Sequence, residues 1–587
     1  MKKSFIISSL FIFALSSCKK NLLDTTPYSQ LSTESMWTSD NLTDLGVNGI
    51  YSALRLGIQT GGESNLEIYQ YDRLGLTGQY RNSDGLMAGT ATPSNGIFAS
   101  NWQNLYEGII RANDAIKNIP LKSPSDDTKK ARLVAEAKFL RAYFYFRLNQ
   151  LYKGVPIYLE PTKYDAFTKP RSSEQDVWNQ VIHDLTDCIN EPAFPNKYTK
   201  GNANFGRATK GAAYALRGKV YMYTKDWTKA VNDFASVKSL GFGLFPNYTQ
   251  LFKEANEQSD EMIFSIQNIS VDGLGSTTQW YCGTRSSFGS CWNDFYVSPN
   301  LVDLYENANG SKFNWDDYIP GYSSMSPVAR QVYFLRDNLT TAEYNAAAAR
   351  GADMTKYLST GNEARIKAVY QNRDPRLAAN VITPYSTYNG VLGAANSLVT
   401  SRFPYRTENA PTLDLRTDQQ TFFYYLYRKF VYEGNSELLN RGYGPIDMPL
   451  IRYADVLLMW AEALNELTDV PGAISKVNEV RTRAGMPLLQ QNDPLLGTYV
   501  TGQVDLRERI RNERRVEFPN EGIDYFDELR WKTLQSTVFK PGNGVQQVWG
   551  QNTITYTWPG DYLYAWPIPQ SEREKNTNLT QNPGWLQ

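Results

Sequence analysis

The sequence predicts a mainly α-helical protein with a tetratricopeptide-like helical repeat scaffold, which a large loop-rich insertion containing short strands interrupts. Apolar residues recur at helical spacing, and a pattern typical of packed helix pairs occurs twice, far apart in the chain. The segment between the two copies is rich in Gly, Ser, Asn and Tyr. We therefore expect a removable signal at 1–17 followed by one interleaved unit. Residues 18–240 and 448–587 are expected to form its helical scaffold, and residues 241–447 its variable region with the ligand site.

The first residues predict a lipoprotein export signal. Lys2 and Lys3 precede an apolar run from Phe5 to Leu15, which is too short to remain in a bilayer as a spanning helix. Small residues then lead to Cys18. We expect cleavage before Cys18 and lipid attachment to its thiol, so that the mature chain is anchored to a membrane outside the cytoplasm.

Two kinds of helical pattern support the scaffold. From Leu133 to Leu151, apolar residues step by three or four positions, which places them on one side of a helix of about five turns that Gly154 and Pro156 end. Small and bulky residues also alternate as in tetratricopeptide helix pairs, where small residues allow close approach and rings fill the groove. The two copies are Tyr214, Gly218, Tyr221 with Ala230, Phe234, Val237, and Leu457, Ala461, Leu464 with Ala473, Val477, Val480.

The intervening residues 241–447 have few long apolar stripes. Short alternating runs, such as Glu261 to Ile266, predict strands between loops. Because long loops on a rigid frame commonly carry binding residues, we expect the ligand site here.

The composition argues against several chemistries. The chain has 39 Tyr, 26 Phe and 13 Trp but a single histidine, His183. Most serine and cysteine hydrolases need a histidine base and many zinc sites need imidazole ligands, so we expect no catalytic residues of these kinds, no metal and no cofactor. Without Lys2 and Lys3, 58 basic side chains stand against 60 acidic ones, which gives no net attraction for nucleic acid.

Seven stretches of the chain are familiar in combination. In order they are MWTSD (36–40) with NGIY (48–51), WQNLYEGIIRAN (102–113), LRAYFYF (140–146) with LYKGVP (151–156), RDPRL (373–377), IRYADVLL (451–458) with AEALN (461–465), NERRVEF (512–518), and PIPQ (567–570) with NLTQNPG (578–584). Together they resemble the SusD/RagB family, the surface nutrient-binding lipoproteins of Bacteroidetes-type bacteria, from Cys18 to the C-terminus.

The resemblance implies four tetratricopeptide-like helix pairs, no catalytic residues, and a lipoprotein that lids a TonB-dependent (SusC-like) outer-membrane transporter. We therefore expect a lipid-anchored, surface-facing outer-membrane protein that captures oligo- or polysaccharide for that transporter. An oligopeptide binder is the alternative, and a glycoside hydrolase with carboxyl groups about 5 to 10 Å apart is the less favoured one. Within the NERRVEF stretch, Glu513, Arg514, Arg515 and Glu517 are expected to form ion pairs in the scaffold.

The candidate ligand residues lie in two loops. The first combines aromatic rings, a guanidinium and a carboxylate in Trp280, Tyr281, Arg285, Trp292 and Asp294. Rings can stack on the C–H faces of a sugar while Arg and Asp bond to its hydroxyls; the alternative is that the tryptophans anchor the loop to the core. The second loop holds Tyr80, Arg81 and Asn82, for which a solvated turn is the alternative.

Two cysteines belong to the first loop. Exported chains form disulfides, and Gly283 and Gly289 allow the chain to turn between Cys282 and Cys291. We expect these two cysteines to form a disulfide that orders the loop.

Overall fold

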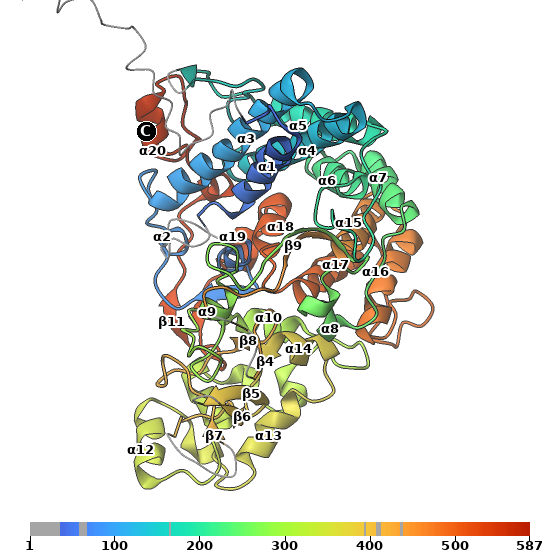
Figure 1. The fold of residues 1–587 in the computed structure, drawn as a ribbon. Helices are drawn as coiled ribbons and strands as arrows, with labels where there is room; N and C mark the ends of the chain where they lie inside the picture. Colours follow the sequence, from blue (N-terminus) through green and yellow to red (C-terminus); the bar gives the residue numbers. More distant parts are fainter. Residues whose placement is uncertain are drawn as a thin grey trace, which may run out of the picture.

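The computed structural model describes residues 36–57, 67–163, 166–392, 395–406, 413–434, 438 and 440–586. The predicted export signal and Cys18 lie outside the described residues. The described chain is mainly α-helical with small two- and three-stranded sheets, as the sequence predicts (Figure 1).

The longer helices form a continuous layer in which each packs on the next. In Figure 1 the helices of the first half of the chain continue into those near its end, with α7 beside α15. The members of this layer, with α18 beneath them, are α1 (Asp40–Ser52), α3 (Gly96–Lys122), α4 (Asp127–Tyr152), α5 (Glu174–Asn190), α6 (Lys210–Thr224), α7 (Trp227–Ser239), α15 (Tyr453–Glu466), α16 (Val470–Ala484), α17 (Gln503–Glu517) and α18 (Asp524–Trp531).

The predicted helices are confirmed, and their ends follow from local chemistry. Helix α4 begins where the Asp126 carboxylate accepts a hydrogen bond from the Lys129 backbone N–H, and ends at Lys153, which has a left-handed φ of 53°. Helices α6 and α7 approach closely at Gly218, where a Cβ atom would lie 2.5 Å from Cε1 of Phe234. A small residue at this position is therefore a requirement of the helix pair.

Short helices and strands, joined by loops, lie between and after the long helices. The short α-helices are α2 (Gly85–Ala88), α8 (Tyr248–Leu251), α9 (Thr278–Cys282), α10 (Pro299–Leu304), α11 (Pro327–Arg330), α12 (Thr341–Ala349), α13 (Asn362–Val369), α14 (Pro375–Asn380), α19 (Leu534–Thr537) and α20 (Gln570–Lys575). The strands are β1 (Gly78–Tyr80), β2 (Met262–Ile266), β3 (Phe295–Val297), β4 (Val381–Ile382), β5 (Thr387–Leu392), β6 (Ala395–Thr400), β7 (Leu413–Asp414), β8 (Leu426–Tyr427), β9 (Met448–Arg452), β10 (Gly544–Gln546) and β11 (Asn552–Thr555).

One strand pair connects the two ends of the loop-rich region to the helical layer. Strand β2, which precedes this region, pairs antiparallel with β9, which follows it, so that Met262 faces Arg452 and Ile266 faces Met448. The strand expected at 261–266 is thus confirmed. Residues 267–447 leave the scaffold and return to it at this one ladder.

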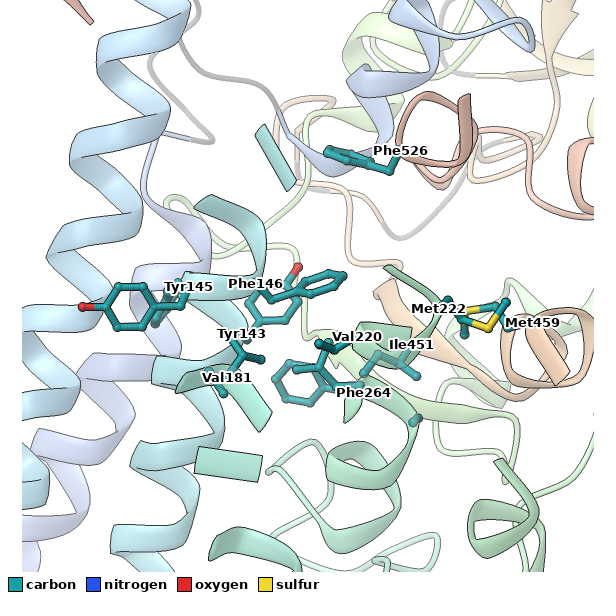
Figure 2. Close-up of a cluster of buried hydrophobic side chains, with 14 of the residues drawn as sticks. Tyr143, Tyr145, Phe146, Val181, Val220, Met222, Phe264, Ile451, Met459 and Phe526 are labelled. Atoms are coloured by element: carbon teal, nitrogen blue, oxygen red, sulfur yellow. The ribbon is translucent and has the colours of Figure 1, made fainter. Parts of the chain in front are cut away.

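The main hydrophobic core is built by both halves of the chain. Figure 2 shows Tyr143 and Phe146 of α4 near Phe264 of β2, with Ile451 of β9 and Phe526 of α18 in the same cluster, and all of these side chains are buried. Burial of such large apolar side chains is the main source of stability, at roughly 25 cal/mol per Å² removed from water. Across the described ranges, no helix is both long and apolar enough to cross a membrane.

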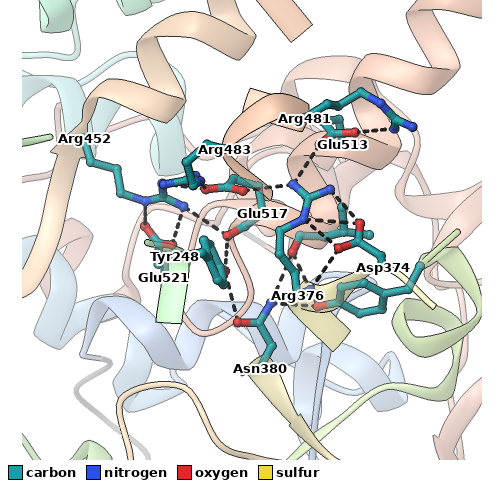
Figure 3. A network of polar contacts seen from close by, with 12 residues as sticks. Tyr248, Asp374, Arg376, Asn380, Arg452, Arg481, Arg483, Glu513, Glu517 and Glu521 are labelled. Atoms are coloured by element: carbon teal, nitrogen blue, oxygen red, sulfur yellow. Dashed lines mark hydrogen bonds and ion pairs between the residues drawn. The ribbon is translucent and has the colours of Figure 1, made fainter. Parts of the chain in front are cut away.

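A buried network of ion pairs joins the scaffold to the loop-rich region (Figure 3). Arg452 contacts Glu261 at 2.8 Å and both Glu517 and Glu521 at 2.7 Å. Arg376 of α14 is the second centre, with Glu517 2.9 Å from its guanidinium. Although burial raises the pKa of Glu517, the surrounding guanidinium groups outweigh it and hold that pKa well below its usual value.

The NERRVEF stretch contributes to this network as predicted, but its residues pair with other elements rather than with one another. Glu513 contacts Arg376 at 2.7 Å and Arg481 at 3.1 Å. The two arginines pair with acids of α15 and α18, among them Asp455, Asp527 and Glu528. These residues therefore bind helices to each other in the interior.

Candidate functional site

The two candidate loops lie side by side because their flanking strands pair. Strand β1 runs antiparallel to β3, with Tyr80 opposite Phe295. The backbone N–H of Arg81 donates to the Asp294 carbonyl at 2.9 Å, which extends the ladder into the loops. Segments more than two hundred residues apart in sequence therefore present their polar and aromatic side chains together.

Three half-buried rings form what we call the aromatic platform, made of Trp280, Tyr281 and Trp292. Trp280 stacks on Tyr281 with ring centres 5.3 Å apart and planes 5° apart, and Trp292 meets Trp280 edge-on at 5.0 Å. Tyr281 also contacts Phe295, on which Tyr80 stacks at 5.2 Å. The rings of both loops thus pack into one aromatic cluster through the buried Phe295.

A chain of ion pairs lies beside the rings. Asp294 contacts the Arg81 guanidinium at 3.1 Å, and Arg81 also pairs with Asp418. Arg285 donates from Nε to the same Asp418 carboxylate at 2.8 Å. The predicted residues Arg81, Arg285 and Asp294 are therefore brought together through an aspartate from a third segment.

Burial and pairing give the two carboxyl groups of this chain different pKa values. Burial raises the pKa of Asp294 to about 6, against the opposing effect of Arg81. Asp418 is less buried, and hydrogen bonds from Arg285 and Arg81 outweigh desolvation and lower its pKa. At neutral pH both carboxylates are ionised and hold their arginines in place.

Two residues at the site are not found by sequence reasoning. Asp418 lies in a polar run, RTDQQ at 416–420, that looks like any solvated loop. Arg441 places its guanidinium carbon 5.1 Å from the Trp280 ring centre and 5.7 Å from that of Trp292. Neither has a sequence signal, because both reach the site only through the tertiary fold.

A polar hollow of about 340 Å³ lies beside Arg73, near the second candidate loop. Arg73 lines it together with Asp84, to which it is paired at 2.8 Å, and with Asn95 and the first residues of α3. The same guanidinium lies 4.8 Å from the Tyr80 ring centre. The volume of the hollow is at the lower end of the range for small-molecule sites, about 300–1,000 Å³.

The remaining candidates take different positions. Asn82 is exposed, and its side-chain amide donates to the Tyr80 hydroxyl at 3.1 Å. Arg441 lies over both tryptophan rings. Trp280 also stacks face to face on Tyr281 and so anchors the loop, whereas the ring contacts of Trp292 are edge-on. Of the two tryptophans, Trp292 is therefore the better placed to stack on a ligand.

The predicted disulfide is wrong. Cys282 and Cys291 are both buried free thiols. Helix α9 directs the Cys282 thiol into the core, 3.7 Å from the Asn520 side-chain oxygen, while the Cys291 thiol donates to the Phe288 carbonyl at 3.2 Å. Hydrogen bonds and ring packing therefore order this loop without a covalent link.

Comparison with known proteins places the chain in a family. A sequence model described as the SusD family matches residues 260–585, more than half of the chain. The chain belongs to the SusD family. A second family model, described as starch-binding and associating with the outer membrane, matches residues 21–222.

Relatives of this SusD-family chain match along most of its length. A SusD-like protein of Formosa agariphila is 26% identical over 573 residues, which is 93% of this chain and 95% of the relative. The starch-binding protein SusD of Bacteroides thetaiotaomicron is 24% identical over 477 residues, 78% of this chain and 74% of its own. A solved SusD-like carbohydrate-binding protein of Bacteroides fragilis has a TM-score of 0.71 at 24% identity, covering 93% of this chain and 100% of the other, which establishes the fold.

Proposed function

We propose that this protein binds an oligo- or polysaccharide on the aromatic platform, with the polar hollow beside Arg73 as a second contact region. The observation that carries the proposal is the meeting of two loops at which half-buried rings lie beside a chain of guanidinium and carboxylate groups. Relatives described as starch-binding and carbohydrate-binding support this ligand class.

The chemistry of the site suits a sugar in two ways. Trp292 and Tyr281 offer apolar ring surface for the C–H faces of a pyranose, and stacking adds about 0.5–1.5 kcal/mol beyond the area buried. Arg81, Arg285 and Asp418 hold donors and acceptors at fixed positions, so hydroxyl groups that leave water find partners without reorganising the loop.

The proposal includes a location and a partner. The predicted export signal, which is cleaved before Cys18, supports a lipid anchor, and the matching family description supports association with the outer membrane. The bound glycan would then be passed to a TonB-dependent transporter. Pull-down on the detergent-extracted lipoprotein should recover a large transporter in near-stoichiometric amount, and recovery of the lipoprotein alone in several detergents would contradict this partnership.

Binding titrations on the mature protein test the ligand. Trp292→Ala should weaken glycan binding by about 1–3 kcal/mol, because truncating a central aromatic anchor removes stacking and buried area. Trp227→Ala, at a half-buried tryptophan at the start of α7, is the matched control and should leave affinity unchanged.

The outcomes separate the alternatives. Equal affinity in both variants, or a fall in melting temperature confined to Trp292→Ala, would assign Trp292 to loop packing rather than to binding. Binding of oligopeptides in place of glycans would favour the peptide-binding alternative. Release of reducing ends from a polysaccharide would indicate a hydrolase.

A further inference from the structure

Most arginines around the aromatic platform are neutralised by aspartates. In each pair a guanidinium nitrogen lies 3.1 Å or less from a carboxylate oxygen, and Asp418 pairs with two of the arginines. The arginines are Arg73, Arg81 and Arg285, and the aspartates are Asp84, Asp294 and Asp418. These six side chains carry no net charge together.

Arg441 differs from these arginines because it has no carboxylate partner among the described residues. Its Nη1 donates to the carbonyls of Gly289 at 2.8 Å and Ser290 at 2.6 Å, which holds the guanidinium across the rings of the platform. The side chain is half-buried, and its Nε and Nη2 make no hydrogen bond to any residue that the structure describes. A fixed cation with free donors thus lies over the platform.

Arg416 belongs to a segment whose backbone lies next to that of Arg285. Its backbone N–H donates to the Ser286 hydroxyl at 2.9 Å, directly beside Arg285, and it precedes Asp418 by two residues. Its side chain is exposed and pairs with no carboxylate in the described part of the chain.

We propose that the glycan bound at this site is acidic, and that its carboxylate or sulfate groups pair with Arg441 and Arg416. This inference rests on the proposed function and specifies its ligand class. A planar guanidinium binds either anion through two parallel hydrogen bonds, whereas a neutral sugar leaves both charges without a partner. The ring beneath Arg441 fixes its orientation before the ligand arrives, which reduces the entropy lost on binding.

Paired probes test the proposal on the mature protein. Polygalacturonate fragments are compared with the same fragments after methyl esterification, and a sulfated galactan with its desulfated form. The acidic member of at least one pair should bind about 10- to 100-fold more tightly, which corresponds to one hydrogen-bonded charge pair. That preference should weaken as salt is raised, because partly exposed charges are screened.

Single substitutions assign the effect to residues. Arg441→Gln and Arg416→Gln should each lower affinity for the preferred acidic probe by about 10-fold while affinity for its neutral partner stays the same. Lys122→Gln, which removes an exposed positive charge in the last turn of α3, is the matched control and should change neither affinity. Because Arg416 is exposed, its substitution remains informative even if Arg441→Gln perturbs the loop.

The possible results distinguish this inference from the function beneath it. A preference within the polygalacturonate pair identifies carboxylate, and one within the galactan pair identifies sulfate. Equal binding of the acidic and neutral members, with arginine variants that behave like Lys122→Gln, would overturn the inference and leave glycan binding standing. Failure of every glycan to bind, with binding of acidic peptides, would overturn both.

Discussion

Replacing Arg452 by Met tests the buried ion-pair network. Arg452 is 1% exposed and donates to Glu261, Glu517 and Glu521. Its removal leaves Glu521 with Lys429, whose pKa desolvation lowers to about 8 although Glu521 opposes the shift. A buried carboxylate would then depend on a weakly charged partner.

The expected loss is large for a single side chain. Removing one partner from a buried ion pair destabilises a protein by about 3–5 kcal/mol, because the remaining charge is left desolvated. The entropy of unfolding is about 2.1 cal/mol/K per residue, so that of the whole mature chain, taken as one cooperative unit, is about 1.2 kcal/mol/K. Dividing the loss in stability by this entropy gives a fall in melting temperature of about 3–4 °C.

Urea titration and calorimetry at neutral pH measure the effect. Lys117→Met is the matched control, since Lys117 lies 3.2 Å from Glu160 with both side chains more than half exposed; that change should stay within about 0.5 kcal/mol. The arginines lower the pKa of Glu517, so their stabilisation is present above the unfolded pKa of about 4.3 and is lost as the pH falls further. The difference between wild type and Arg452→Met should therefore shrink in acid.

Two results would refute this reasoning. A stability of Arg452→Met equal to that of the control would show that the network gives no net stabilisation, because the apolar surface of Met would then offset the lost ion pairs. A second change, Glu521→Gln, should recover part of the loss in the Arg452→Met background because it removes a buried carboxylate whose remaining ion-pair partner is the weakly charged Lys429. Further destabilisation by that second change would contradict the account as well.

Helix packing, cysteine state and one buried carboxyl group give three further predictions. Gly218→Ala should destabilise the protein by about 1–3 kcal/mol through its clash with Phe234, whereas Gly49→Ala, in open space on α1, should stabilise it by up to about 1 kcal/mol in the same urea titration; equal effects would contradict this. Thiol labelling of the denatured mature protein lacking Cys18 should find three reactive thiols, which are Cys188, Cys282 and Cys291. A single reactive thiol would instead indicate the disulfide between Cys282 and Cys291. Because burial raises the pKa of Asp294 to about 6, the folded state holds its proton more tightly than the unfolded chain between pH about 4 and 6, so this group favours folding as pH falls through that window. Asp294→Asn should remove that contribution from the pH dependence of stability, and an unchanged profile would contradict it.

The helical scaffold could be predicted because its signals are local. The apolar steps along α4 and the small residue at Gly218 reflect packing between neighbouring segments of the chain. The two candidate loops could also be recognised, since their composition is unusual. Their meeting, and the participation of Asp418 and Arg441, could not be predicted, because these depend on strand pairing and contacts between distant segments.

The error over the disulfide has the same origin. Sequence spacing showed that the chain could turn between Cys282 and Cys291, but not which way each side chain would point. A short helix at α9 fixes the direction of Cys282 toward Asn520. Direction, unlike proximity along the chain, is set by tertiary structure.

The ladder between β2 and β9 has a consequence for how this architecture can vary. Residues 267–447 start and finish at adjacent paired strands, so this segment is a long loop whose two ends are held together. The entropy of closing a flexible loop grows only with the logarithm of its length, about 0.6 kcal/mol for each doubling. The segment can therefore change in length at little entropic cost wherever it does not contact the scaffold. Its buried contacts are more constrained, because Arg376 pairs with Glu513 and Glu517 of α17. An exchange of the segment between relatives would have to keep these ion pairs.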